Sequence, residues 1–144
     1  MIKSATLVLG ERQLLSLPSP WMLRALVFAG CFAAGAAALL LVDPGTQAIS
    51  DPALGHLLRG MAAIKGVLAL GAAAALAWRF GRPIGGGRAL LLMAGCWIMA
   101  AAAGMIWQLA HIGAAAVLFH SGELGLLGAL WWEHRGALGN TARP

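Results

Sequence analysis

The segment from Arg88 to His134 is almost continuously apolar, and this one feature excludes most folds. As a single α-helix it would be about 70 Å long, whereas the hydrocarbon core of a bilayer is about 30 Å thick. The segment must therefore turn back on itself. Polar and glycine residues at 108–114 (QLAHIGA) mark the turn, so we expect two antiparallel membrane-spanning helices at 89–109 and 112–132.

Two further apolar segments precede this region, at 21–42 and 57–78. Residues 43–54 (DPGTQAISDPAL) separate them with two prolines and a glycine, and 81–87 (GRPIGGG) follows the second one. Both connections favour turns over helix. The first segment is about twice as long as the apolar part of a signal peptide, so we interpret it as an uncleaved spanning helix.

The composition supports a membrane protein. Of the 144 residues, 60% are hydrophobic and only 10% are charged, against about 25% charged in a typical soluble domain. A soluble fold of this size could not cover so much apolar surface. Basic residues are not interleaved with aromatic ones in any run, so we expect no binding of nucleic acid. The predicted fold class is all-α, an integral membrane four-helix bundle.

Arginine and lysine placement predicts how the helices cross the membrane. The loops at 43–54 and 108–114 contain neither residue. The positive-inside rule then places both chain ends and the middle connection in the cytoplasm (N-in/C-in), with two antiparallel helical hairpins. We expect a cytoplasmic tail at 1–20, a transmembrane domain at 21–134, and a second cytoplasmic tail at 135–144. A bacterial inner (plasma) membrane is the expected location. The basic residues that carry this prediction are Lys3, Arg12, Arg24, Arg79, Arg82, Arg88, Arg135 and Arg143.

Lys65 and Glu123 are the most informative polar residues, because both lie near the middle of a predicted span. An ionisable group at the bilayer centre costs about 3 kcal/mol or more, so such groups usually face a partner inside the protein. The two predicted helices run in the same direction, which brings these side chains to similar depths. His120 shares a helix face with Glu123. We therefore predict a buried contact between Lys65 and Glu123, within an intramembrane polar centre that also includes His120. This centre is either a structural ion pair or a proton relay, and the alternative is that Lys65 extends outward to the interface.

Four other polar residues are expected at the outer interface. His56 and His111 begin the second and fourth spans, and two histidines at equal depth could ligate a haem iron. With Arg59 and Gln108 nearby, they could instead frame a quinone headgroup. The simpler alternative is that these histidines face water and lipid headgroups. We expect no metal site, because His120 and Glu123 lack matching ligands on other helices.

No nucleophile elbow, phosphate loop or HExxH motif is present, so we expect no enzymatic activity and no cofactor. Small residues recur every fourth position, as at Ser121, Gly125 and Ala129, which favours close helix packing. The main prediction is a non-enzymatic accessory or assembly partner, whose own partners are the bilayer and either a homo-oligomer or other membrane subunits. The alternatives are a small proton-coupled transporter or channel using Lys65, Glu123 and His120, and a haem- or quinone-binding anchor using His56 and His111.

Overall fold

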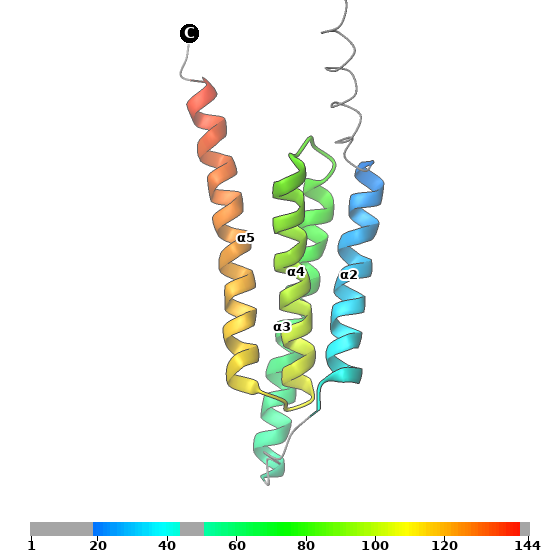
Figure 1. Cartoon of the computed structure of the whole chain (residues 1–144). Helices are drawn as coiled ribbons and strands as arrows, with labels where there is room; N and C mark the ends of the chain where they lie inside the picture. Colours follow the sequence, from blue (N-terminus) through cyan, green and yellow to red (C-terminus); the bar gives the residue numbers. More distant parts are fainter. Residues whose placement is uncertain (1–18, 44–50, 142–144) are drawn as a thin grey trace, which may run out of the picture.

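The computed structural model describes residues 19–43 and 51–141, and these residues form four α-helices and no strand. Successive helices run in opposite directions (Figure 1). All four are long and apolar enough to span a membrane. The predicted all-α class is therefore confirmed. The helices are α2 (Pro20–Leu41), α3 (Pro52–Arg79), α4 (Gly86–Trp107) and α5 (Ile112–Thr141).

The first two helices each begin with a capping residue followed by proline. The Ser19 hydroxyl accepts a hydrogen bond from the Met22 amide at 3.4 Å, and the Asp51 carboxylate accepts one from Ala53 at 2.9 Å. Proline suits the first helical position because its missing N–H would have no helical acceptor there. The cap at Asp51 explains why α3 begins before residue 57, where the sequence predicted its start.

The turn between α4 and α5 is tighter than predicted. It occupies residues 108–111, and Gly113 lies within α5. Leu109 and His111 have φ values of 58° and 46°, in the left-handed region that residues other than glycine seldom adopt. The chain reverses here by straining two ordinary residues, since the available glycine is already in the helix.

Helix α5 continues to Thr141, well past residue 132, where the sequence predicted its end. Residues 135–141 are thus helical, and their place in a cytoplasmic tail stays a prediction. The other predicted tail, 1–20, lies outside the described residues except for its last two. Most of the predicted 43–54 loop also lies outside them.

Helix α4 is the centre of the fold, since it packs against each of the other three helices. In Figure 1, α5 lies on one side of α4 and α2 on the other. Glycines bring the backbones close together. A Cβ atom on Gly122 would lie 2.9 Å from the Gly95 carbonyl oxygen, and one on Gly104 would lie 3.0 Å from the Gly35 carbonyl oxygen. Small residues therefore fix how α4 meets α5 and α2.

The two ends of the bundle differ in charge. We call the end where α2 and α4 begin and α3 and α5 end the basic end. Among the described residues it carries one acid, Glu133, and five arginines. Four tryptophans at this end are exposed, as expected where a bilayer meets water. The arginines are Arg24, Arg79, Arg82, Arg88 and Arg135, and the tryptophans are Trp21, Trp78, Trp131 and Trp132.

Candidate functional site

Helices α3 and α5 both pack on α4 and run parallel to each other. They are joined by polar side chains at two levels. One level is near the middle of both helices, and the other is at the basic end. Both levels lie on the surface that α3 and α5 form together where they pack on α4. We call this surface the α3–α5 face.

The middle level is a chain of three polar groups. Lys65 Nζ lies 3.5 Å from His120 Nε2, and His120 Nδ1 lies 3.1 Å from a Glu123 carboxylate oxygen. A lysine ammonium can only donate and a carboxylate can only accept. A neutral His120 with its proton on Nδ1 satisfies both contacts, accepting from Lys65 and donating to Glu123. The tautomer assigned in this way gives a centre with no net charge.

His120 lies between the two residues that the sequence expected to meet directly. Among the described residues, no hydrogen bond or ion pair joins Lys65 to Glu123. The Lys65 ammonium is also placed over the Phe119 ring, 4.0 Å from its centroid. A ring face attracts a cation. Two residues of α5, His120 and Phe119, therefore contact the Lys65 ammonium, and neither of them is acidic.

The polar centre is open on one side. The His120 and Glu123 side chains are 60% and 45% exposed, and Lys65 is half-buried. Glu123 lies in the middle of the 112–135 span, so in a bilayer the open side faces hydrocarbon. Ionisable groups at that depth normally face protein or water. The structure of a single chain thus leaves this centre incompletely covered.

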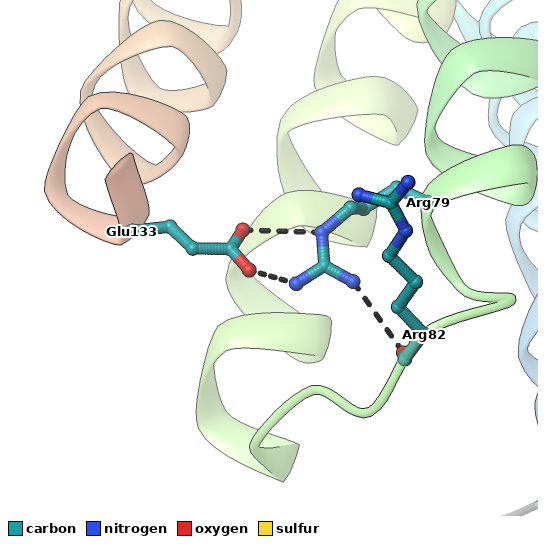
Figure 2. Close-up of polar contacts among 3 residues, drawn as sticks. All are labelled: Arg79, Arg82 and Glu133. Carbon is teal, nitrogen blue, oxygen red and sulfur yellow. Dashed lines mark hydrogen bonds and ion pairs between the residues drawn. The ribbon is translucent and has the colours of Figure 1, made fainter. Parts of the chain in front are cut away.

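The second level is an ion pair that the sequence analysis missed. The Arg79 guanidinium donates to both carboxylate oxygens of Glu133, from Nε to Oε2 at 3.3 Å and from the adjacent NH2 group to Oε1. Its remaining NH2 group donates to the Arg82 carbonyl at 3.4 Å (Figure 2). Side-chain exposure is low, at 17% for Arg79 and 27% for Glu133. A bidentate pair of this kind fixes both partners.

A signal for this pair exists in the sequence. Lys65 precedes Arg79 by 14 residues, and His120 precedes Glu133 by 13. On two parallel helices these spacings differ by about 1.5 Å along the axis, so the sequence places Arg79 and Glu133 at one depth if Lys65 and His120 share another. From the sequence, Arg79 is expected only as a marker of membrane topology.

In the part of the chain that the structure describes, no hydrogen bond or ion pair joins the four residues expected at the outer interface to one another. His56, Arg59 and His111 are exposed. The Gln108 side-chain amide donates to the Leu39 carbonyl at 2.6 Å, which ties the end of α4 to the end of α2. Within the described residues, no group of three His, Cys, Asp or Glu side chains has the arrangement of a metal site. Binding of haem or quinone at His56 and His111 stays a prediction.

An apolar groove connects the two polar levels. Its volume is about 240 Å³, and it runs between α3 and α5 with α4 as its floor. Glu123 lines its mid-bilayer end and Arg79 its basic end. The lining between them is entirely leucine, alanine and methionine. These residues are Leu68, Ala72, Ala75, Leu76, Leu92, Met99, Leu126, Leu127 and Leu130.

Four apolar helices, three of them packed around the central α4, are compatible with a small polytopic membrane protein. Comparison with protein-family models, curated proteins and solved structures found no match. The polar centre and the groove are therefore the features from which a function can be argued.

Proposed function

We propose that this chain is a non-enzymatic accessory subunit that works in a membrane assembly and binds a further transmembrane helix on its α3–α5 face. That helix comes from a second copy of the chain or from another membrane protein. The observation that carries the proposal is the exposure of His120 and Glu123 at mid-bilayer depth. In lipid, a single chain would present both groups to hydrocarbon.

The energetics favour covering this centre with protein. An exposed ionisable group at the bilayer centre costs about 3 kcal/mol or more. A partner helix with one or two polar side chains would supply hydrogen bonds that lipid cannot, each worth about 0.6 kcal/mol and up to about 1.7 kcal/mol. Helix α5 has room for such a neighbour, because among the described helices it packs substantially only on α4.

The membrane orientation that accompanies this proposal has both chain ends in the cytoplasm. Two helical hairpins, α2–α3 and α4–α5, then expose the basic end to the cytoplasm. Five arginines and four exposed tryptophans at that end support this orientation. The chain would sit in a bacterial plasma membrane.

Photo-crosslinking tests the assembly proposal. A photoreactive residue at Leu124 lies one turn from His120 on α5, and Leu124 is 69% exposed. The control position is Leu40 on α2, which is 82% exposed and far from the centre. We expect protein adducts from position 124 in intact membranes and none from position 40. Lipid adducts alone at both positions would contradict the proposal.

A second candidate function is proton transfer, and the order of the three polar groups favours it. A proton can leave Lys65 Nζ for His120 Nε2 while the proton on Nδ1 passes to Glu123. The N–H bonds at Nζ and Nδ1 break, N–H and O–H bonds form at Nε2 and the carboxylate, and the imidazole changes tautomer. Lysine and glutamate end neutral, so the step balances without another reactant.

Liposome flux measurements separate the two functions. A transporter should move protons when reconstituted alone, and Glu123→Gln should abolish that movement because the carboxamide accepts no proton. The Glu133→Gln variant at the basic end is the matched control. Equal flux in all three proteins, or none in any, would eliminate proton transfer and leave the assembly proposal standing.

A further inference from the structure

The groove between α3 and α5 has the length of one lipid leaflet. Glu123 lines its mid-bilayer end, and Glu133, the partner of Arg79, marks the level of its basic end. These residues are ten positions apart on α5, which corresponds to about 15 Å along a helix. Half of a hydrocarbon core of about 30 Å is the same length. The groove thus extends from the interface to the middle of the bilayer.

The wall of the groove is suited to a hydrocarbon chain. Every lining residue between its two ends is apolar, and Ala72 and Ala75 on α3 leave room opposite the leucines of α5. A transmembrane helix is about 10 Å across, too wide for a groove of this volume. A single acyl chain is narrow and flexible enough to lie in it.

An exposed positive charge, that of Arg82, lies next to the basic end of the groove, which we call its mouth. Arg79 is neutralised by Glu133, and Arg82 lies beside this pair at the α3–α4 turn (Figure 2). The Arg82 guanidinium stacks on the Trp78 ring at 5.3 Å and is exposed to solvent. A phosphodiester headgroup carries one negative charge, which the Arg82 guanidinium would attract.

From these three features we infer that the groove binds an anionic phospholipid of the leaflet at the basic end. One acyl chain lies between α3 and α5 and reaches toward Glu123, and the phosphate contacts Arg82. Basic residues at the mouth of a cleft between transmembrane helices are a known means of selecting anionic lipid. The inference rests on neither the assembly proposal nor the proton-transfer proposal, although the groove lies on the same α3–α5 face that the partner helix would bind.

Lipid retention tests the inference with two matched pairs of variants. Ala75→Phe fills the groove, whereas Ala74→Phe adds the same ring at an exposed neighbour that does not line it. Arg82→Gln removes the cation at the mouth. Arg135→Gln removes a similar exposed arginine, stacked on Trp131 at 5.1 Å but away from the groove. Each protein is reconstituted in vesicles of equal phosphatidylglycerol and phosphatidylcholine, extracted mildly, and its bound lipid counted by native mass spectrometry.

We expect the unmodified chain to retain phosphatidylglycerol in preference to phosphatidylcholine. Arg82→Gln should reduce this preference about fivefold, and Ala75→Phe should abolish retention of both lipids, while the two controls behave like the unmodified chain. Equal retention of both lipids by the unmodified chain would overturn the inference. Retention of lipid by the Ala75→Phe variant would overturn it too. So would an Ala75→Phe variant that loses a protein partner but keeps its bound lipid. Circular dichroism of each variant shows that the helices are intact.

Discussion

The contact of α4 with α5 and the contact of α3 with α5 are made in opposite ways. Helix α4 meets α5 at Gly95 and Gly122, where the two backbones nearly touch. Helix α3 meets α5 across a groove, through Lys65 with His120 and Arg79 with Glu133. The first contact, which we call the dry contact, is made at these positions by glycine, methionine and leucine. The second is made through polar side chains and is partly open.

The difference between the two contacts indicates which one stabilises the fold and which one is free for function. Close packing of small residues stabilises helix association in lipid without leaving any group that needs a partner. Polar groups at mid-bilayer depth are costly unless protein or water covers them. The α4–α5 contact at Gly95 and Gly122 therefore does not depend on the polar residues of the α3–α5 face, which are available for a partner, a proton or a lipid.

The largest expected effect comes from breaking the dry contact. Gly122→Leu would force a side chain into the Gly95 carbonyl and the Met99 side chain, both 2.9 Å from the position of a Cβ atom. We expect a loss of about 3 kcal/mol of stability, measured by thermal unfolding in detergent. The control is Gly125→Leu, where no atom lies within 4 Å. A similar loss in both variants would mean that α4 and α5 are not joined in this way.

Breaking the ion pair at the basic end should have a smaller effect. Glu133→Gln leaves the Arg79 guanidinium with a neutral acceptor in a half-buried position. We expect a loss of about 1.5 kcal/mol. Exchanging the two residues, as Arg79→Glu with Glu133→Arg, should recover most of it. If the exchange recovers nothing, the two side chains are not paired.

The Lys65–His120 contact should be weaker still, because it is open on one side. A double-mutant cycle with Lys65→Met and His120→Leu isolates their interaction. We expect a coupling energy of about 0.6 kcal/mol, the average for hydrogen bonds between transmembrane helices. The matched cycle pairs Lys65→Met with His134→Leu, and it should give no coupling. Equal coupling in the two cycles would refute the contact.

Much of the fold could be predicted from the sequence, because span length, Pro52 and the Pro83 turn each act locally. The central position of α4 could not be predicted. Helices α2 and α4 have a similar apolar composition, so composition alone does not identify the interior helix. What distinguishes α4 is that Gly95 and Gly104 face glycines on two different neighbours, and this depends on how each helix is rotated.

The candidate site was predictable only in part, because the sequence indicates the depth of a residue in its helix and not the rotation of that helix. Depth follows from sequence position, so Lys65 and Glu123 could be assigned to one level. Rotation about the helix axis does not follow, and it is rotation that places His120 between them. The Arg79–Glu133 pair was missed because Arg79 already had a simpler explanation, as a marker of membrane topology.

The smallest expected effect concerns the turn that joins the two helices of the dry contact. His111→Gly should relieve the positive φ of 46° and raise stability by about 0.5 kcal/mol. His56→Gly, within helix α3, should instead lower it by about 1 kcal/mol. Thermal unfolding of the two variants checks this difference in sign. A loss in both variants would indicate that His111 has a role beyond the turn, such as binding a cofactor.

The central claim is that the polar centre of the α3–α5 face is covered by protein in the membrane. Replacing it with apolar residues, as Lys65→Met, His120→Leu and Glu123→Leu together, tests this claim directly. Particle mass after mild extraction from the membrane should exceed that of one chain for the unmodified protein and fall to that of one chain for the triple variant. A single-chain mass for the unmodified protein, or an unchanged larger mass for the triple variant, would contradict the account.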